Sequence, residues 1–281
     1  MNRYMETGAA FDQASHGYDH SFTYSTIGIL QRKRVYHYLN ETLEENKALK
    51  ILEINCGTGE DAIWMAKKGH LVTGIDVSSG MIEKAVKKLS RESRDLQVNF
   101  SCMSFDDLKS HFEPHSFDVI FSDFGGLNCI DHRNFESLAD DFSNLLKPGG
   151  KFIAVIMGRK CLWEMLYFIL KGKPLAALRR LSKKSVVASV GSARVPAWYF
   201  SPDTSISFFK GKLHFKEVRP VGICIPPSYL ENFFKKKHIL LSLLQKAEPV
   251  FNFSFLADFA DHYFISFVKG TPPVQQHTSN S

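Results

Sequence analysis

Residues 52–59, LEINCGTG, constrain the fold of this chain more than any other segment. They join a short apolar run to a pair of glycines, and a helical pattern begins near Glu60. Two glycines allow a tight turn in which backbone N–H groups at the start of a helix approach a ligand closely. The segment therefore predicts a strand, a binding loop and a helix in succession.

Apolar and β-branched runs alternate with helical patterns over the first 157 residues. We expect strands at residues 50–55, 71–76, 97–102, 117–122 and 151–157, with helices between them. This alternation is typical of repeated βαβ units and a parallel sheet. Since ligands of open α/β sheets bind beyond the carboxyl ends of the strands, one rim should carry Asn55, Asp76, Ser104 and Asp123.

The alternation stops after residue 157 in an aromatic-rich segment, 158–201, which opens with an apolar helical run at 162–170. We expect an inserted lid there, after the fifth strand. Patterning returns at 215–225, 229–246 and 262–269 and predicts an antiparallel pair of strands around a helix. The predicted fold is α/β, a Rossmann-like doubly wound sheet of seven mostly parallel strands. Its core is 1–157 and 202–270, and 271–281 form a disordered tail.

Charge and cysteine usage limit the classes of protein that fit this sequence. The net charge is +6, but residues 158–185 carry eight basic side chains and one acid, or +7, which leaves the rest of the chain near −1. The basic character is therefore local. The five cysteines are widely spaced and form no CxxC pair, which argues against a disulfide framework and a zinc site. With no apolar signal core and no run of about 18 apolar residues, we expect a cytoplasmic chain without a transmembrane segment or a metal.

The glycine loop alone does not identify its ligand. Gly57-x-Gly59-x-x-Ala62 fits a relaxed dinucleotide fingerprint, and Asp76 follows at the distance expected for a ribose contact. An NAD-type dinucleotide is therefore an open alternative.

The acidic residues around the loop favour a different cofactor. Glu60 and Asp61 at the start of the helix would repel a pyrophosphate, although they also suit the helix dipole by themselves. S-adenosylmethionine carries no phosphate, and its sulfonium and ammonium groups suit neighbouring acids such as Glu53, Asp76 and Asp123.

Four blocks of sequence carry a family resemblance. Residues 52–59 (LEINCGTG), 76–81 (DVSSGM), 116–120 (SFDVI) and 145–152 (LLKPGGKF) stand in the order and spacing of class I S-adenosylmethionine-dependent methyltransferases. Residues 11–19 (FDQASHGYD) also resemble the N-terminal segment of the ubiquinone and menaquinone biosynthesis type within that class. The resemblance covers mainly residues 52–157.

The resemblance implies a set of cofactor-binding residues along the predicted rim. The methionine end would be met by Glu53, Asn55, Gly57 and Gly59, with Tyr18 and Asp123 approaching it. Asp76 would hold both ribose hydroxyls, and Val77 and Met81 would lie against the adenine. Asn55 departs from the usual glycine, so its side chain must point away or join the contacts. Ser104 stands where many relatives carry an aspartate, which would leave Phe105 and backbone groups to contact the adenine.

Three of these residues have a simpler interpretation. Asp76 could belong to the approach of a helix capped by Ser78, Tyr18 could be a packing residue, and Asp123 could cap the following loop.

Methyl transfer requires few catalytic groups from the protein. The sulfonium is already a good leaving group, so positioning can supply most of the catalysis. A general base helps only if the acceptor loses a proton. His132 is the first candidate, followed by His16 and His20, and each could equally be a surface histidine.

The predicted lid should select the acceptor. Its apolar wall and cations suit a small hydrophobic molecule, lipid-like or anionic, and residues 158–185 could contact a membrane surface. A packed helix with a solvated basic face is the simpler alternative. No NPPY-type sequence follows the fourth strand, where the chain reads SDFGG from residue 122. A nucleic-acid acceptor is disfavoured, and an RNA methyltransferase or a non-catalytic cofactor-binding or scaffold protein are the remaining alternatives.

Overall fold

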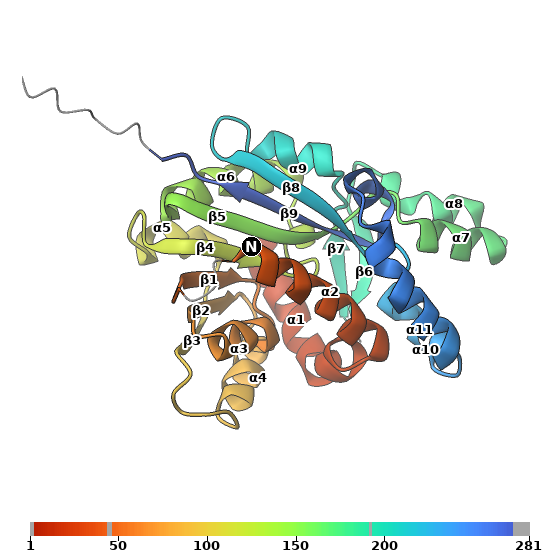
Figure 1. Ribbon diagram of the computed structural model, residues 1–281, viewed down its shortest axis with the longest axis horizontal. Coiled ribbons are helices and arrows are strands. Elements are labelled where there is room, and N and C mark those ends of the chain that lie inside the picture. Colours follow the sequence, from red (N-terminus) through yellow and green to blue (C-terminus); the bar gives the residue numbers. More distant parts are fainter. Residues whose placement is uncertain (1–2, 44–46, 191–192, 272–281) are drawn as a thin grey trace, which may run out of the picture.

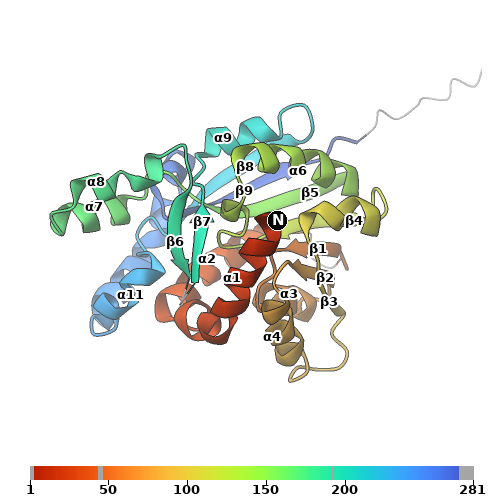
Figure 2. The ribbon, with the colours of Figure 1, turned by 180° about the vertical axis from the view of Figure 1, so that it is seen from behind.

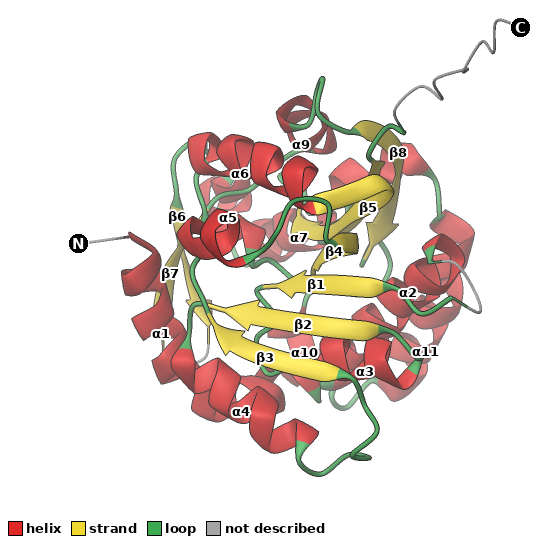
Figure 3. Cartoon of the chain, turned by 90° about the vertical axis from the view of Figure 1, so that its left-hand side faces the viewer, coloured by secondary structure: helices red, strands yellow, loops and turns green. Residues whose placement is uncertain are grey.

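A seven-stranded sheet runs through the molecule in the order β3-β2-β1-β4-β5-β9-β8 (Figure 1, Figure 3). The computed structural model describes residues 3–43, 47–190 and 193–271, so the predicted tail lies outside the described residues from 272 on. The strands are β1 Lys50–Ile54, β2 Leu71–Asp76, β3 Val98–Cys102, β4 Phe117–Ser122, β5 Leu146–Met157, β8 His214–Val221 and β9 His262–Val268. β1 to β5 pair in parallel, and β9 is antiparallel to both of its neighbours. The predicted Rossmann-like, mostly parallel sheet is confirmed.

Helices connect the strands and cover the sheet on both faces. They are α1 Arg3–Tyr18, α2 Thr26–Thr42, α3 Glu60–Lys67, α4 Ser79–Leu89, α5 Leu108–His111, α6 His132–Leu145, α7 Leu162–Leu170, α8 Pro174–Ala177, α9 Pro202–Phe208, α10 Glu231–Phe234 and α11 His238–Ala247. A serine or aspartate side chain caps four of them by accepting a hydrogen bond from the N–H three residues on: Ser25, Ser78, Asp131 and Ser201. Such caps satisfy backbone donors that the first helical turn leaves without a partner.

The hydrophobic core lies in two layers, one on each face of the sheet. Side chains of a strand point alternately to the two faces. Leu52 of β1 packs in a cluster that includes Phe135 of α6, whereas Ile51 packs in a second cluster with Tyr38 of α2 and Met65 of α3. Because both faces are buried at the centre of the sheet, β1, β4 and β9 are largely buried and mostly apolar, whereas the edge strands β3 and β8 are more exposed and more polar.

The segment after β5 forms the predicted helix and a hairpin that was not predicted. α7 coincides with the apolar run at 162–170, and it extends outward with α8 from one end of the molecule (Figure 1, Figure 2). β6 (Val186–Val190) and β7 (Ala193–Ala197) form a separate antiparallel hairpin that packs against α1 (Figure 2). That this segment acts as a lid stays a prediction.

Two elements near the carboxyl terminus differ from the sequence prediction. The single helix expected at 229–246 is broken into a 3-10 turn, Ser228–Leu230, and the helices α10 and α11. The break falls at three consecutive lysines, where Lys237 leaves helical geometry and places its ammonium 3.8 Å from the centre of the Phe233 ring.

The strand expected at 215–225 ends at Val221. The two carboxylate oxygens of buried Glu248 accept hydrogen bonds from the N–H groups of residues 222–225, at 2.7–3.3 Å. These donors are therefore not free to continue the sheet.

Candidate functional site

The carboxyl ends of β1 and β4 lie side by side at the switch point of the sheet. β2 and β3 extend the sheet to one side of β1, and β5 extends it to the other side of β4. Loops diverge at such a point and leave room for a ligand. The residues that follow β1 and β4 there are Asn55 and Asp123, and Asp76 ends the neighbouring β2.

The loop after β1 is built on left-handed backbone. Asn55, Gly57 and Gly59 have φ angles of 55°, 51° and 74°. A Cβ at Gly59 would lie 2.5 Å from the ring of Phe100 on β3, so glycine lets the loop fold down onto the sheet. Asn is one of the few other residues that tolerate this conformation, which explains how Asn55 replaces the glycine usual in the family that the sequence resembles.

The side chain of Asn55 is turned away from its own loop and toward the loop after β4. A Cβ at Gly126 would lie 2.4 Å from the Cβ of Asn55, and Ser122 Oγ donates to Asn55 Oδ1 at 3.4 Å. Asn55 therefore fills the space between the two loops, and only glycine fits opposite it.

Asp76 joins the first two loops of the rim. Its Oδ2 accepts a hydrogen bond from Gly57 N, and its Oδ1 accepts one from Ser78 N, both at 2.9 Å. Burial raises the pKa of Asp76 to about 6, although these two hydrogen bonds work in the opposite direction. A buried carboxylate with lone pairs left over is well suited to accept hydrogen bonds from a diol.

A hollow with an apolar wall lies against Asp76. It encloses about 370 Å³, part of it open to solvent, and its lining is Thr7, Asn55, Ile75, Asp76, Val77, Met103, Phe105, Gly126, Cys129 and Ile130. An apolar pocket with one carboxylate at its edge fits a nucleoside, whose base is flat and whose ribose donates hydrogen bonds.

The N-terminal helices close over this rim. Asp12 of α1 accepts hydrogen bonds from Ser78 Oγ and Gly80 N, both at 2.7 Å, at the start of α4. Asp19 accepts one from Thr58 Oγ1 of the glycine loop at 2.6 Å. Two acids of the resembling segment, residues 11–19, therefore fasten it to the two binding loops.

A second, more polar hollow adjoins the first at Asn55. It encloses about 300 Å³, again partly open, and its lining is Tyr18, Thr23, Arg32, Asn55, Cys56, Gly57, Thr58, Glu60, Asp61, Asp123 and Phe124. Phe124 has a φ of 38°, which strains a non-glycine residue. Arg32 forms an ion pair with Asp61, and the Nε to Oδ1 distance is 2.9 Å.

Buried carboxyl groups gather at this second hollow. Burial raises the pKa of both Glu53 and Asp123 well above the usual carboxyl range, and the nearby charge of Asp61 raises both further. Glu53 Oε2 and Asp123 Oδ2 are buried and have no hydrogen-bond partner within the described part of the chain. Buried acceptors without partners are costly, so a cationic ligand in the second hollow would relieve them.

Seven of the predicted cofactor residues line one or both hollows: Tyr18, Asn55, Gly57, Asp76, Val77, Phe105 and Asp123. The other four, Glu53, Gly59, Met81 and Ser104, are not part of either lining. Glu53 is buried, Gly59 is the N-cap residue of α3, and Met81 is buried in the first turn of α4. The Ser104 hydroxyl caps the turn Phe105–Asp107, so its side chain is engaged and its cofactor contact stays a prediction.

The predicted base candidates lie outside both hollows. His132 is the first residue of α6, and its ring packs edge-on against Phe200 and Phe208. Burial, assisted by the charge of Arg159, lowers its pKa. His16 and His20 are exposed.

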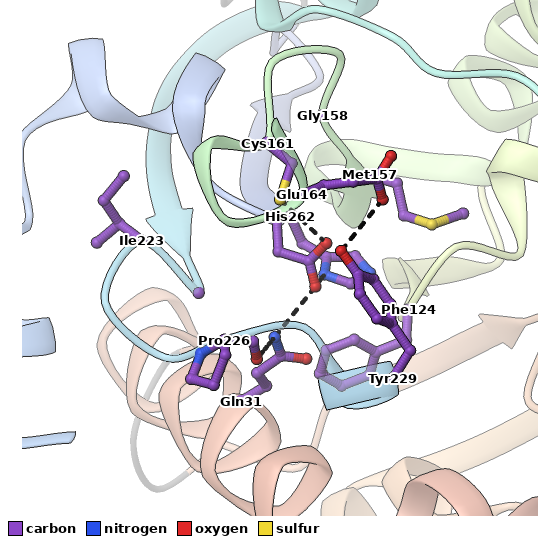
Figure 4. A network of polar contacts seen from close by, with 12 residues as sticks. Gln31, Phe124, Met157, Gly158, Cys161, Glu164, Ile223, Pro226, Tyr229 and His262 are labelled. Carbon is purple, nitrogen blue, oxygen red and sulfur yellow. Dashed lines mark hydrogen bonds and ion pairs between the residues drawn. The ribbon is translucent and has the colours of Figure 1, made fainter. Parts of the chain in front are cut away.

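A separate polar cluster, which we call the insertion network, lies next to the residue that follows β5 and the residue that precedes β9. Buried Glu164 of α7 accepts hydrogen bonds from Arg179 and Arg180 at 2.7–3.0 Å, and Arg180 also pairs with Asp261 at 2.9 Å. Gln31 of α2 donates to Asp261 at 3.2 Å. Figure 4 shows Glu164, Cys161 and His262 gathered around this cluster with Gln31. Two arginines of the predicted basic lid therefore point inward and hold the insertion to the core.

The rest of the insertion exposes apolar side chains next to lysines. We call residues 162–184 the insertion tip. Leu170 and Leu175 are 77% and 87% exposed, and Lys171, Lys173 and Lys184 are exposed beside them. Apolar surface at a protruding end commonly marks an interaction site.

Arg32 is the main residue of the second hollow that the sequence did not single out. It belongs to the run Gln31-Arg32-Lys33-Arg34, which resembles a solvated basic face. A signal was nevertheless present, because Arg32 lies four residues after Gly28 and three before Val35, on the buried face of α2.

The described residues contain no group of three or more His, Cys, Asp or Glu side chains placed to hold a metal ion. None of the helices within the described ranges is both long and apolar enough to cross a membrane.

Comparison with known proteins agrees with the geometry of the rim. A family profile described as a methyltransferase domain matches residues 51–150. A demethylmenaquinone methyltransferase of Chlorobaculum tepidum is 32% identical over 186 residues, which cover 63% of this chain and 71% of that protein. A second one, from Clavibacter sepedonicus, is 30% identical over 148 residues, which are 53% of this chain and only 56% of the relative.

A solved structure extends the likeness beyond the matched segment. An S-adenosylmethionine-dependent methyltransferase from Methanosarcina mazei aligns with a TM-score of 0.57 at 19% identity, over 84% of this chain and 98% of that one. At this identity the likeness concerns the fold alone.

Proposed function

Because this chain belongs to the class I S-adenosylmethionine-dependent methyltransferases, we propose that it transfers the methyl group of S-adenosylmethionine to a small, hydrophobic acceptor. When bound, the cofactor supplies an activated methyl group, which the acceptor displaces from sulfur in one in-line step. What the protein adds is binding, orientation and, for some acceptors, removal of a proton.

Two buried carboxyl groups at the second hollow, each with an oxygen that has no hydrogen-bond partner among the described residues, carry the proposal. Glu53 Oε2 and Asp123 Oδ2 fit the ammonium of the cofactor's amino-acid portion, and the charge also complements the sulfonium. The first hollow fits the adenosine, with Asp76 accepting from the ribose and with Val77 and Phe105 beside the base. A dinucleotide fits less well, since its pyrophosphate would meet Glu60 and Asp61.

A hydrophobic acceptor is supported by the rings that border the second hollow. Phe124 stacks edge-on between Phe22 and His262, with ring centroids 5.0 and 5.4 Å away. By their names, the relatives from Chlorobaculum and Clavibacter methylate demethylmenaquinone. We propose an acceptor of similar apolar character that reaches the methyl group past Phe124.

The acceptor is best identified by labelling. The protein is incubated with methyl-labelled S-adenosylmethionine and a small-molecule extract of the source cell, and labelled products are found by mass spectrometry. One labelled lipophilic product supports the proposal. A parallel incubation with total RNA of the source cell tests the RNA alternative, which label in that RNA would establish. Cofactor binding without a labelled product in either incubation would establish a non-catalytic protein.

Two histidines are candidates for a general base if the acceptor loses a proton. His132 was predicted from the sequence, but it packs between aromatic rings outside both hollows. His262 begins β9 beside Met157, its Nδ1 is 3.2 Å from Asp261 Oδ2, and its ring faces Phe124. Neither histidine lines a hollow, and the Nδ1 of His262 forms no hydrogen bond within the described residues. We favour His262 because its ring contacts Phe124, which lines the second hollow.

The two histidines are separated by paired variants. His262→Ala should reduce turnover of the identified acceptor roughly 100-fold or more, with unchanged affinity for S-adenosylhomocysteine. His132→Ala should leave turnover near the wild-type rate. The reverse pattern would assign the role to His132.

We further propose that the insertion tip binds a membrane surface rich in anionic lipid. Exposed leucines such as Leu170 and Leu175 would enter the interface, while Lys171 and Lys173 would meet the headgroups. A protein that works at the cytosolic face of a membrane would collect a lipid-like acceptor there. Accordingly, we place this protein in the cytoplasm, where its unpaired cysteines would stay reduced.

Vesicle co-sedimentation tests the surface. We expect binding to vesicles with anionic lipid at low salt, and loss of binding in the double variant Lys171→Glu, Lys173→Glu. The matched control reverses exposed lysines on other helices, Lys33→Glu and Lys87→Glu, and should bind like wild type. Equal loss in both variants would indicate a general charge effect, and no binding by the wild type would remove the proposal.

A further inference from the structure

The chain exposes a second apolar surface around α11. We call residues 232–255, which comprise α11 and the segments on either side of it, the C-terminal surface. Six of its apolar side chains are more than half exposed: Phe233, Ile239, Leu243, Val250, Phe253 and Phe255. Ile239 is the most exposed of them, at 81%. Apolar surface that gathers in this way commonly marks a site of interaction.

The helix α11 is apolar on opposite sides. Leu241 packs inward, in a cluster with Leu230 and Phe234. Ile239 and Leu243 lie four residues apart and therefore share a face of the helix, and both are exposed. A helix that is apolar all round is normally covered on every side. The outer face of α11 is therefore the side on which we expect a partner.

The charged side chains that this surface exposes are lysines. Residues 232–255 contain four lysines and one acid, which give a net charge of +3. The lysines are all exposed: Lys235, Lys236, Lys237 and Lys246. The acid, Glu248, is buried and accepts hydrogen bonds from the N–H groups of residues 222–225. An anionic partner therefore complements the surface.

The residue types favour a lipid surface over a protein as this partner. Residues 232–255 contain no Trp, Tyr or Arg, the residue types that dominate binding at protein interfaces, where lysine is depleted. A second copy of the chain fits poorly, because a symmetric contact would place lysines against lysines. Apolar side chains bordered by lysines are typical of helices that lie in the interface of a membrane.

The C-terminal surface adjoins the insertion tip. The ring of Trp163 on α7 packs edge-on against that of Phe234 on α10, with centroids 5.8 Å apart. The ring of Tyr167 on α7 packs against that of Tyr229 in the same way, at 5.9 Å. Accordingly, α10 and α11 lie at the end of the molecule from which α7 and α8 extend (Figure 1, Figure 2). Both surfaces are therefore available to the same membrane.

We propose that the C-terminal surface binds membranes that contain anionic lipid. Ile239, Leu243 and the exposed phenylalanines enter the interface, and the lysines meet the headgroups. The inference extends the membrane contact proposed for the insertion tip and rests on the proposed function to that extent. Two neighbouring contacts fix the orientation of the protein on the membrane, whereas a single tip would let it rotate.

Co-sedimentation of the full chain with vesicles of phosphatidylcholine and phosphatidylserine at low salt tests the inference. The double variant Ile239→Ser, Leu243→Ser should bind these vesicles on the order of 100-fold more weakly, since burial of each apolar side chain contributes about tenfold. The double variant Lys236→Glu, Lys246→Glu should bind at least roughly 30-fold more weakly, because each lysine near an anionic surface contributes about fivefold.

Matched controls change exposed residues elsewhere. Ile29→Ser, Val86→Ser removes exposed apolar side chains of α2 and α4. Lys33→Glu, Lys87→Glu reverses lysines of the same two helices. Both double variants should bind like wild type. Circular dichroism checks that every variant is folded, which we expect because all the substituted side chains are exposed.

The outcomes separate this surface from the insertion tip. Affinity at the wild-type level in either variant of the C-terminal surface would overturn the inference, and loss confined to Lys171→Glu, Lys173→Glu would leave the tip as the membrane contact. Sedimentation velocity without vesicles tests the second copy. A wild-type dimer that Ile239→Ser, Leu243→Ser dissociates would assign the surface to self-association and also overturn the inference. If the wild type binds no vesicles, both membrane contacts are wrong, while methyl transfer is judged separately from the labelled product.

Discussion

Two regions of the molecule bury charged groups in opposite ways. In the insertion network, Glu164 and Asp261 face Arg179 and Arg180, and every one of these side chains has a partner at 3 Å or less. At the second hollow, Glu53, Asp61 and Asp123 lie near Arg32, and three of these four groups keep an atom with no hydrogen-bond partner among the described residues.

The difference separates a structural cluster from a binding site. The paired network completes itself and fastens the insertion to β9. The hollow is complete only when a ligand supplies the missing charges. Titratable groups that are strongly perturbed are common at both kinds of site, so the balance of charge is the more useful indicator here.

The largest expected effect is a loss of stability when a buried charge is removed from the insertion network. Glu164→Gln would leave two arginines without their carboxylate, and removing one partner of a buried pair costs about 3–5 kcal/mol. Denaturant unfolding should show this loss, while affinity for S-adenosylhomocysteine stays unchanged in the folded variant. Glu41→Gln is the control, because its partner Arg219 is near the surface and Glu41 is 44% exposed. Its cost should be about 0–1 kcal/mol. Equal stability of the two variants would show that the network does not hold the insertion.

The next largest effect comes from removing the carboxylate of Asp76, which joins the loops after β1 and β2. Asp76→Asn should weaken binding of S-adenosylhomocysteine by about 1.5–3 kcal/mol, the contribution of hydrogen bonds to a charged group. Calorimetry measures the affinity, and an unfolding curve must show that the variant remains folded, since Asp76 also accepts from Gly57 and Ser78. Glu83→Gln, an exposed change on α4, is the control. Unchanged affinity in Asp76→Asn would exclude the ribose assignment.

The proposed cofactor site could largely be predicted from the sequence because it depends on local sequence patterns. The glycines of the first loop, the acid at the end of β2 and the apolar strands each have a short-range signature. The strands β2 and β4 were predicted to the residue, at 71–76 and 117–122. Asp76 and Asp123 follow from those two strands.

The rest depends on contacts between distant segments. Arg180 meets Asp261 across 81 residues and looked like part of a solvated basic run. Arg32 meets Asp61 in the same way, from a helix that precedes the matched domain. Only the three-dimensional packing distinguishes a basic residue that points inward from one that faces solvent. The sequence therefore predicts the net charge of the insertion, but it does not predict that two of its arginines form buried ion pairs.

A third substitution should stabilise the protein, whereas substitution in the insertion network should destabilise it. Glu53→Gln removes a buried acid whose Oε2 has no hydrogen-bond partner in the described part of the chain, so the ligand-free protein should gain stability on the order of 1 kcal/mol, as in other trades of function for stability. Affinity for S-adenosylmethionine should fall at the same time. Unfolding curves with and without cofactor measure both effects. A destabilised ligand-free variant would mean that Glu53 has a structural partner and that the two regions are alike.

The smallest expected effect is the pH dependence of cofactor affinity. Burial raises the pKa of Asp76 to about 6 from its ordinary 3.8, so the folded, ligand-free protein takes up a proton there as the pH falls through 6. This uptake adds stability to the ligand-free protein at low pH and removes it as the pH rises, whereas hydroxyl donors of the ribose require the ionised carboxylate. Affinity should therefore fall as stability from this group rises. From Asp76 alone the loss of affinity is roughly twofold between pH 7 and 6, and it approaches tenfold per pH unit well below the pKa.

Glu53 and Asp123, whose pKa values are raised as well, act in the same direction. In Asp76→Asn the dependence should become shallower but persist. Affinity that is constant from pH 7 to 5 would mean that these acids do not meet the cofactor, and the contrast between the two regions would then lose its functional meaning.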